Sequence, residues 1–276
     1  MKFVKMQANG NDYVYVAKSQ ITTNDLSSLA KKVSNRRFGV GSDGLIVIDK
    51  IDSKTISMQM FNSDGSEGKT CGNGVRCSAF FAQKYLGVTQ SEITVLTKSN
   101  PSKVQILSRD SFSATVKANM GVPKRKFTPF LVQSLQKVGL YVDYQDIFEV
   151  DVGNPHLVFF TDKYDLFSLS NGARKSNFYK DGINVERVYE IENLSPKHYR
   201  ILCEVYERGS GKTLSCGSGG VAVAYSFAQK HSLDVDGVTF TVSMDGGDAQ
   251  ISFENDCAFL QSEVKIVFEG ELKNEV

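Results

Sequence analysis

The sequence predicts a mixed α/β protein built from two similar halves that face each other. One observation behind this prediction is that strand-like runs are frequent and helix-like runs are few, which does not fit a regular βαβ alternation. The other is a cysteine–glycine motif that occurs once in each half of the chain. A length of 276 residues suggests about two domains. Such a chain can bury a sizeable core without disulfides or metal ions.

Three helices are predicted. The first covers Asn24 to Asn35, where apolar side chains share one face. The second runs from about Gly74 to Leu86, with Gly87 as its C-cap, and the third runs from near Gly219 to near His231. Runs rich in Val, Ile, Phe and Thr predict strands. These cover residues 14–16, 44–48, 55–61, 92–97, 104–107, 112–118, 148–152, 157–161, 201–206, 238–243, 250–253 and 264–268.

Composition and charge exclude several classes of protein. The 32 Lys and Arg nearly cancel the 31 Asp and Glu, so no basic surplus is available to bind nucleic acid or a membrane surface. Apolar runs such as Leu45 to Ile48 are too short to span a bilayer. Polar residues at 9–12 interrupt any signal peptide. We therefore expect a cytoplasmic protein with neither a nucleic-acid nor a membrane partner.

The cysteines do not form a disulfide or zinc pattern. Five of them are widely spread, and an odd number in a long chain does not indicate a disulfide framework. The sequence has no Cys-x-x-Cys pair and only three unclustered histidines, so no metal site is predicted. Each cysteine is therefore a buried packing residue or a reactive thiol.

An internal repeat is the most informative feature of the chain. Cys71-Gly72-Asn73-Gly74 recurs as Cys216-Gly217-Ser218-Gly219, and each copy opens a helical stretch. The two stretches share the residues Phe-Ala-Gln-Lys at 81–84 and 227–230, and Gly-Asn occurs early in both halves, at 10–11 and 153–154. Several coincidences in the same order indicate two similar halves.

The repeated cysteines have the setting of acid/base groups. A thiol at a helix N-terminus has its pKa lowered by the macrodipole, and the N–H groups there can hold a carboxylate. Two such elements could place one sulfur on each face of an α-carbon, as a two-base racemase requires. A lone motif of this kind would more simply be a packed cysteine beside a turn, but its repetition favours the reactive reading. Cys77, Cys203 and Cys257 lack this setting and are expected in the core.

Other polar residues are ambiguous when taken one at a time. Turn chemistry explains most of the asparagines beside Gly, Asp or Pro, and a lone histidine such as His156 is commonly a satisfied core residue. As a set, they could bind a second amino and carboxyl group, with Arg208 suited to a carboxylate. The glycine-rich stretches at 39–44 and 209–213 lack the strand and helix context of nucleotide sites and are predicted to be turns. The asparagines concerned are Asn11, Asn62, Asn73, Asn154 and Asn184.

Motifs along essentially the whole chain resemble the diaminopimelate epimerase family. Besides the two cysteine motifs, they lie at residues 10–13, 37–44, 61–66, 153–156, 184–186 and 207–209. The resemblance implies two pseudo-symmetric α/β halves of the α+β type. Each half would be a mostly antiparallel sheet wrapped around a central helix, with the active site in the cleft between them. It also implies residues 1–119, with 263–276 returning to them, as one half and 120–262 as the other.

The resemblance implies a cofactor-independent epimerase that interconverts LL- and meso-diaminopimelate for lysine and peptidoglycan synthesis. Cys71 and Cys216 would be the acid/base pair, with His156 and Glu207 beside the reacting centre. It further implies a homodimer that uses neither pyridoxal phosphate nor a metal. Substrate contacts are expected from Asn11, Asn62, Asn154, Asn184 and Arg208, and carboxylate contacts from Gly72, Asn73, Gly217 and Ser218.

Two other hypotheses remain at this point. The same thiol mechanism could act on another amino acid, such as histidine. Alternatively, the protein could bind an amino acid without catalysis, in which case both cysteines would be dispensable.

Overall fold

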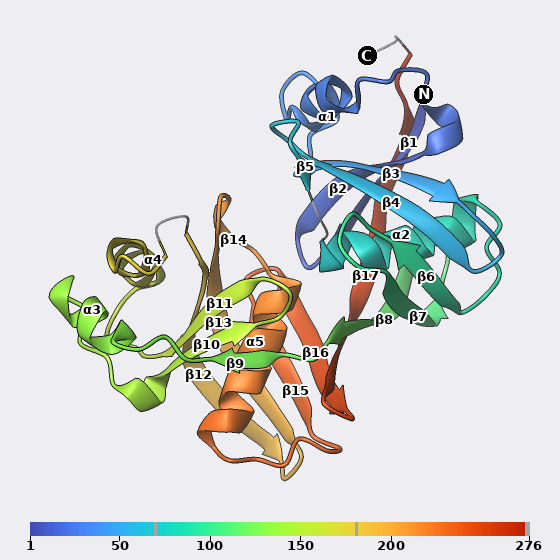
Figure 1. Ribbon diagram of the computed structural model, residues 1–276. Helices are drawn as coiled ribbons and strands as arrows, with labels where there is room; N and C mark the ends of the chain where they lie inside the picture. Colours follow the sequence, from blue (N-terminus) through green and yellow to red (C-terminus); the bar gives the residue numbers. More distant parts are fainter. Residues whose placement is uncertain (69–70, 180–181, 274–276) are drawn as a thin grey trace. The chain divides into compact units, whose positions relative to one another are not determined.

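The computed structural model divides into two compact units (Figure 1). Unit 1 is Met1–Asn119 with Gln261–Val276, and unit 2 is Met120–Leu260. The chain enters unit 2 within strand β8 (Ser113–Gly121) and leaves it within β17 (Cys257–Glu271). The described residues are 1–68, 71–179 and 182–273, so the last three residues of the expected returning segment 263–276 lie outside them.

Unit 1 is a sheet wrapped around helix α2 (Gly72–Tyr85), which packs against six of its strands. The strands pair in the order β17–β1–β2–β3–β4–β6–β7–β8, and β8 also pairs with β17. The β2–β3 and β4–β6 pairs are parallel, and the β1–β2, β3–β4, β6–β7 and β7–β8 pairs are antiparallel. The bounds are β1 (Lys2–Ala8), β2 (Asn11–Ala17), β3 (Gly44–Lys50), β4 (Thr55–Asn62), β5 (Glu67–Gly68), β6 (Glu92–Leu96) and β7 (Ser102–Arg109).

Unit 2 repeats this plan around helix α5 (Gly217–Lys230). The pairs β11–β12 and β13–β15 are parallel, and β10–β11, β12–β13 and β15–β16 are antiparallel, so β10 to β16 reproduce the pairing of β1 to β7. This confirms the predicted fold class of two similar α/β halves. The bounds are β9 (Lys124–Lys126), β10 (Ile147–Asp151), β11 (Pro155–Phe160), β12 (Asn184–Ser195), β13 (His198–Glu207), β14 (Gly211–Thr213), β15 (Thr239–Met244) and β16 (Gly247–Glu254).

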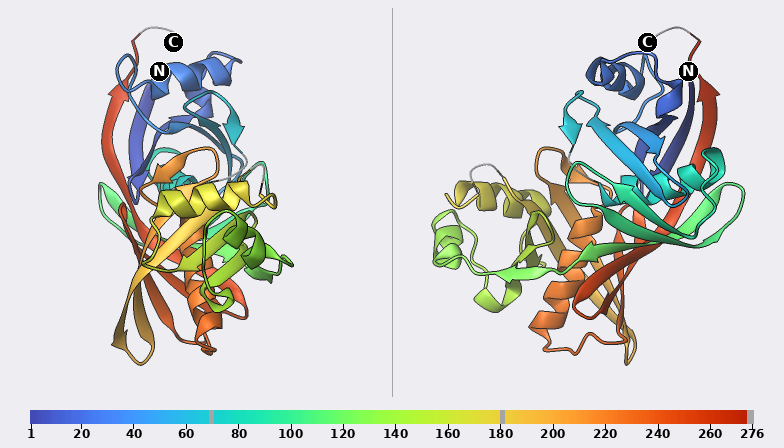
Figure 2. Two further views of the ribbon diagram at one scale, coloured as in Figure 1. Left: turned by 90° about the vertical axis from the view of Figure 1, so that its left-hand side faces the viewer. Right: turned by 45° about the vertical axis from the view of Figure 1, so that its right-hand side comes forward.

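The two central helices differ from the outer ones in their side chains. In α5, small residues such as Gly219, Ala222 and Ala224 are buried, because strands cover the helix on several sides. The amphipathic helix α1 (Leu26–Ser34) instead buries one face, Leu29, Ala30 and Val33, on the sheet of unit 1. In unit 2, α3 (Leu131–Lys137) and α4 (Leu166–Lys175) contact each other, and α4 packs on β12 and β13 (Figure 2).

The three predicted helices and all the predicted strand runs are confirmed, with ends that shift by a few residues. The sequence analysis missed β1, whose apolar run is interrupted by Lys5 and Gln7, the long strand β12, and the helices α3 and α4, of which α4 contains Ser, Asn and Gly. The short strands β5, β9 and β14 were also not predicted. Tertiary packing overrides these weak local signals, since Leu166 and Leu169 are buried in an apolar cluster. The short 3₁₀ turns at Lys18–Gln20 and Tyr144–Asp146 were also not predicted.

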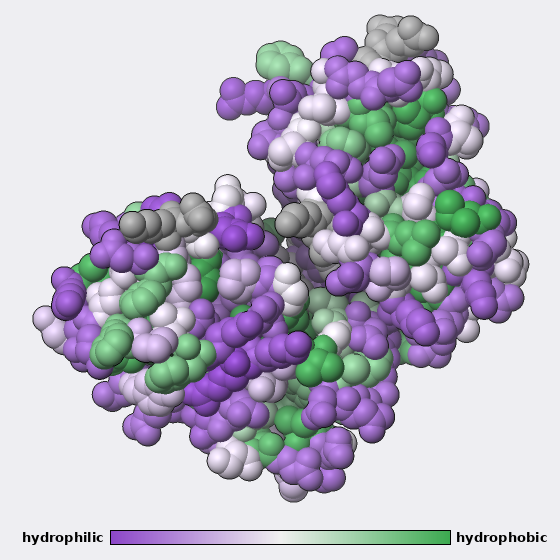
Figure 3. All heavy atoms as spheres, in the orientation of Figure 1, coloured by the Kyte–Doolittle hydropathy of each residue, from purple (hydrophilic) through white to green (hydrophobic). Residues whose placement is uncertain are grey.

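The surface is mainly polar. Among the described residues, no helix combines the length and apolar character needed to cross a membrane. The face shown in Figure 3 is covered mostly by hydrophilic side chains, and its hydrophobic side chains form small separate groups.

Candidate functional site

Cys71 and Cys216 occupy the same position at the starts of α2 and α5. Each is the N-cap residue, with φ and ψ of −143° and 118° at Cys71 and −132° and 115° at Cys216. Each sulfur accepts a hydrogen bond from the backbone N–H three residues later, at 3.5 Å from Gly74 and 3.4 Å from Gly219. The sequence analysis placed these helix starts two residues too late. Both sulfurs therefore lie at the positive end of a helix dipole.

The glycine at the third helical position is required by close packing in both units. A Cβ on Gly219 would lie 2.6 Å from Glu186 Oε1 and 3.1 Å from Cys216 Cβ. A Cβ on Gly74 would lie 2.8 Å from Ile46 Cδ1. The last glycine of each Cys-Gly-x-Gly motif thus lets another side chain approach the start of the helix.

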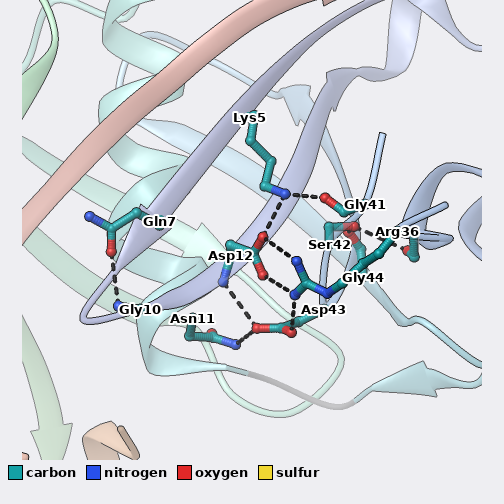
Figure 4. Close-up of polar contacts among 11 residues, drawn as sticks. Lys5, Gln7, Gly10, Asn11, Asp12, Arg36, Gly41, Ser42, Asp43 and Gly44 are labelled. Carbon is teal, nitrogen blue, oxygen red and sulfur yellow. Dashed lines mark hydrogen bonds and ion pairs between the residues drawn. The ribbon is translucent and has the colours of Figure 1, made fainter. Parts of the chain in front are cut away.

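In unit 1, Asn11 links Cys71 to an acidic side chain. The Cys71 thiol donates to Asn11 Oδ1 at 3.4 Å, and Asn11 Nδ2 donates to Asp43 Oδ2 at 2.8 Å (Figure 4). Asn11 begins β2 and Asp43 immediately precedes β3, and the parallel β2–β3 register brings these two strand starts together. Asp43 therefore fixes which end of the Asn11 amide faces Cys71, a role that the sequence analysis did not assign to it.

Behind Asn11 lies a small network of charges (Figure 4). Arg36 donates to Asp12 Oδ1 at 2.8 Å and to Asp43 Oδ1 at 3.0 Å, and Lys5 pairs with Asp12 at 2.5 Å and donates to the carbonyl oxygen of Gly41. Burial would raise the pKa of Asp12, but hydrogen bonds from Arg36 and Lys5 outweigh it and lower that pKa. Burial and the neighbouring Asp12 raise the pKa of Asp43. Two cations thus hold two adjacent carboxylates in place.

We expect Lys5→Met to lower the free energy of unfolding by about 2–3 kcal/mol, because it leaves a buried carboxylate with one cation fewer. The side chains of Lys5 and Asp12 are only 7% and 17% exposed. Lys18→Met is the control, since the Lys18–Asp49 pair is largely exposed and such pairs contribute about 0–1 kcal/mol. Urea unfolding followed by circular dichroism measures both. Equal losses in the two variants would contradict the assigned importance of the network.

In unit 2, Cys216 is linked to His156 through Ser218. The Cys216 Sγ–Ser218 Oγ distance is 3.4 Å, and the Ser218 Oγ–His156 Nε2 distance is 3.0 Å. Asn154 Oδ1 lies 3.2 Å from the same ring nitrogen. The structure thus brings four of the predicted site residues of this unit into one hydrogen-bonded group.

Glu186 completes this group and was not among the predicted site residues. Its Oε1 lies 2.7 Å from His156 Nδ1, and both side chains are fully buried. Glu186 is two residues after Asn184 on β12, so the two side chains share a face of the strand, but the sequence analysis did not predict this strand.

Burial and carboxylates oppose ionisation of Cys216. Burial raises the pKa of its thiol well above the ordinary value, and Glu207 and Glu186 raise it further, against smaller lowering effects of Ser218 and the Gly219 N–H. Burial also raises the pKa of Glu207. Its carboxylate accepts a 2.6 Å hydrogen bond from Thr213 Oγ1 and also shares a hydrogen bond with Cys216. These effects favour the thiol form of Cys216 and oppose the effect of the helix dipole.

For Glu207→Gln, we expect a stability change that depends on pH. The folded-state pKa of Glu207 is raised, so wild-type stability falls as pH rises from the ordinary value of 4.5 through the raised one. The variant, which cannot ionise, should therefore gain stability relative to wild type between pH 4 and pH 7. Thermal melts across this range test this expectation, with the exposed Glu190→Gln as the control. A difference that does not change with pH would refute it.

Three further predicted residues lie at or beside strand ends: Asn184 begins β12, Asn62 ends β4 and Arg208 follows β13. Asn184 donates to the Pro155 carbonyl oxygen at 3.3 Å and accepts from the Arg208 backbone N–H at 2.9 Å. Asn62 ends β4 and donates to Ser66 Oγ at 2.9 Å. Asn73 Oδ1 accepts a hydrogen bond from the buried Arg76 at 2.7 Å. The backbones of Gly72, Asn73, Gly217 and Ser218 lie in the first turns of α2 and α5, directly after the two cysteines.

The other cysteines have different environments. Cys77 and Cys203 are fully buried, as predicted, and burial raises the pKa of Cys77 to about 12. Cys257 was also expected in the core, but it is partly exposed because it begins strand β17. The glycine-rich stretch at 209–213 is a turn leading into β14, as predicted, and that at 39–44 leads into β3.

Among the described residues, His156, Glu186 and Cys216 could supply ligands to a metal ion. One ligand atom from each lies within 4.8 Å of the others. Both ring nitrogens of His156 already have hydrogen-bond partners, so binding of a metal to this histidine would displace either Glu186 from Nδ1 or Ser218 and Asn154 from Nε2.

Comparisons with known proteins agree with these motifs. The family model described as diaminopimelate epimerase matches residues 3–126 and 148–267. A diaminopimelate epimerase from Bacillus licheniformis is 35% identical, covering 98% of this chain and 97% of its own, and one from Bacillus cereus is 35% identical, covering 91% and 89%.

Solved structures with much lower identity share the fold. A predicted epimerase from Pseudomonas aeruginosa has a TM-score of 0.71 at 11% identity, covering 99% of both chains. A phenazine biosynthesis protein of the PhzF family from Bacillus anthracis has a TM-score of 0.70 at 15% identity, covering 99% of this chain and 98% of its own. With the repeated halves, the two capping cysteines and the family match over most of its length, the chain belongs to the diaminopimelate epimerase family of isomerases.

Proposed function

We propose that this enzyme interconverts LL- and meso-diaminopimelate with Cys71 and Cys216 as its two acid/base groups. The observation that carries the proposal is that both thiols are helix N-cap residues with the same backbone conformation and the same N–H···S bond. In the forward direction one sulfur, as thiolate, removes the α-proton from one face. The other, as thiol, delivers a proton to the opposite face, and the roles exchange in the reverse direction.

The helix starts supply what a carbanion intermediate needs. An amino-acid α-proton is far less acidic than a thiol, so the developing charge needs strong stabilisation. First-turn N–H groups have no partner within a helix and can hold the α-carboxylate, at Gly72, Asn73, Gly217 and Ser218. A preorganised donor of this kind is worth about 3–4 kcal/mol toward charge that develops in the transition state.

The polar surroundings support a substrate that carries a second amino-acid end. Asn11, Asn62, Asn154 and Asn184 offer amides, and Arg208 offers a planar fork suited to a carboxylate. Asn184 orders the Arg208 backbone through a 2.9 Å hydrogen bond. A second amino-acid end would give these groups charged partners, and a site built to hydrogen-bond such an end discriminates against substrates that lack it.

The same proposal covers the cellular role. The reaction would proceed without pyridoxal phosphate or metal, because the two thiols perform both proton transfers. It would supply lysine and peptidoglycan precursors in the cytoplasm, and the enzyme would act as a homodimer.

The test is a substrate panel under reducing conditions without added pyridoxal phosphate. LL-diaminopimelate, L-histidine and other L-amino acids are incubated separately, and the inverted isomer is measured by chiral chromatography. We expect inversion of diaminopimelate alone. Inversion of histidine or another amino acid in its place would keep the thiol chemistry and reassign the substrate. No inversion across the panel, together with measurable amino-acid binding, would replace the enzyme by a binding protein.

A further inference from the structure

A buried acid–imidazole pair lies beside Cys216. His156 and Glu186 are both fully buried, with 2.7 Å between Nδ1 and Oε1. The second carboxylate oxygen, Glu186 Oε2, is buried without a hydrogen-bond partner. Burying a carboxylate in this way is costly, and a buried polar atom without a partner calls for an explanation in function.

The pair continues into a chain of hydrogen bonds that ends on the thiol. His156 Nε2 lies 3.0 Å from Ser218 Oγ, which lies 3.4 Å from Cys216 Sγ. Strand β11 supplies His156, β12 supplies Glu186, and the first turn of α5 supplies Ser218. The parallel β11–β12 pairing and the glycine at position 219 allow these elements to approach so closely.

The donors and acceptors in this chain can be assigned. An ionised carboxylate only accepts, so His156 Nδ1 must carry the proton that it shares with Glu186. With a neutral ring, Nε2 accepts from the Ser218 hydroxyl, which in turn accepts from the Cys216 thiol. With a protonated ring, Nε2–H donates, and Asn154 Oδ1 at 3.2 Å becomes a second acceptor for it. With a neutral ring, Nε2 and Asn154 Oδ1 are both acceptors, so the Asn154 contact favours the protonated ring.

We propose that Glu186 is a positioning residue that holds His156 with Nδ1 protonated, so that the Cys216 proton passes through Ser218 to His156 Nε2. This rests on the proposed function, in which Cys216 alternates between acid and base. The S–H bond breaks as a new Ser218 O–H bond forms, and the original hydroxyl proton moves to Nε2. Thiolate and imidazolium result, and the reverse transfer restores the thiol. No proton leaves the group of residues.

The surrounding charges explain why such a proton store is useful. Within unit 2, the titratable side chains that act on Cys216 or lie within 4.8 Å of it are Glu186 from β12, Glu207 from β13 and His156 from β11. Two carboxylates oppose the thiolate. A proton kept on His156 places a positive charge beside both the thiolate and Glu186, and so offsets this repulsion.

The first experiment examines Cys216 without substrate. Alkylation of Cys216 by iodoacetamide is followed by peptide mass spectrometry from pH 6 to 10, in EDTA, for wild type, Glu186→Gln, Ser218→Ala and the exposed control Glu190→Gln. Proton transfer from the Cys216 thiol to His156 leaves the total number of protons on the group unchanged, so its equilibrium does not depend on pH. The alkylation rate of Cys216 in wild type should therefore show a plateau near neutral pH. The plateau should fall at least about tenfold in both Glu186→Gln and Ser218→Ala, since each removes one part of the relay. Glu190→Gln should retain it.

The second readout is the tautomer of His156, measured by ¹⁵N NMR. Wild type and Ser218→Ala should have the neutral ring protonated at Nδ1, whereas Glu186→Gln should show a mixture of tautomers. A residue that only stabilises the fold would change the melting temperature without this split between the variants. If Glu186→Gln does not fold, Ser218→Ala still tests the relay. The relay requires that Ser218→Ala lose the plateau in the alkylation rate and keep the Nδ1-protonated tautomer of His156.

The third readout uses the reaction itself. In a Cys71→Ala background, Cys216 alone can exchange the α-hydrogen of diaminopimelate with deuterated water, and adding Glu186→Gln should slow this exchange by about tenfold or more.

A smooth wild-type alkylation profile without a plateau, or an unchanged plateau and tautomer in Glu186→Gln, overturns the relay even if diaminopimelate is inverted. Absence of inversion by wild type overturns the proposed function instead, and the alkylation and NMR results then judge the relay separately.

Discussion

Cys71→Ala and Cys216→Ala should each reduce the interconversion of diaminopimelate isomers by about 1,000-fold or more, because inversion needs a proton donor and an acceptor on opposite faces. Both variants should remain folded. Each sulfur accepts a long hydrogen bond at its helix start, 3.5 Å from Gly74 to Cys71 and 3.4 Å from Gly219 to Cys216, and the loss of such a bond costs little stability. Initial rates by chiral chromatography, with circular dichroism for the fold, provide the measurement.

Cys257→Ala is the matched control for these variants, since Cys257 is a partly exposed thiol at the start of β17 and has no assigned role. It should retain wild-type activity. A single variant at Cys71 or Cys216 can still exchange the α-hydrogen from one face, so exchange and inversion must be measured separately. Wild-type inversion rates in both single variants would exclude the two-thiol mechanism.

Gly219→Ala should also impair the enzyme strongly. The new methyl group would lie 2.6 Å from Glu186 Oε1 and 3.1 Å from Cys216 Cβ, so the carboxylate, and His156 with it, must move. A misplacement of about 1 Å in a catalytic group costs about 100-fold in rate. We expect a loss of this size in kcat together with a lower melting temperature, because overpacking at a buried position outweighs the better helix propensity of alanine.

Gly220→Ala provides the control for this substitution. It adds the same methyl group one residue later, where the nearest atom, Met244 Cε, is 3.7 Å away in ordinary contact. Its activity should remain close to that of wild type. Equal activity of the two glycine variants would show that the position of Glu186 does not matter for turnover.

Much of the fold and the centre of the candidate site could be predicted from the sequence. The repeated Cys-Gly-x-Gly motif predicts both the two halves and the two helix starts, because a helix N-terminus and its glycines leave a local signal. Strands such as β3 and β15 are visible as continuous β-branched and apolar runs. The structure places Cys71 with Asn11, and Cys216 with Ser218, His156 and Asn154.

The residues that were missed act through contacts distant in the sequence. Asp43 reaches Asn11 only because β2 and β3 pair in parallel, and Glu186 reaches His156 only because β11 and β12 do. A single sequence does not reveal which strands pair. Asp43 stands in a glycine-rich stretch that was predicted to be a turn, and Glu186 lies on β12, a strand that the sequence analysis did not predict. Their importance depends on burial and hydrogen bonds that the fold creates.

The most direct test of the two-thiol account is where solvent deuterium appears early in the reaction. LL-diaminopimelate is incubated with the enzyme in deuterated water, and the two isomers are separated at low conversion and examined by mass spectrometry. If one thiol removes the proton and another delivers its own, the meso product carries one deuterium while the remaining LL-isomer carries none. Product that retains the original hydrogen, or equal labelling of both isomers from the start, would contradict two separate acid/base groups.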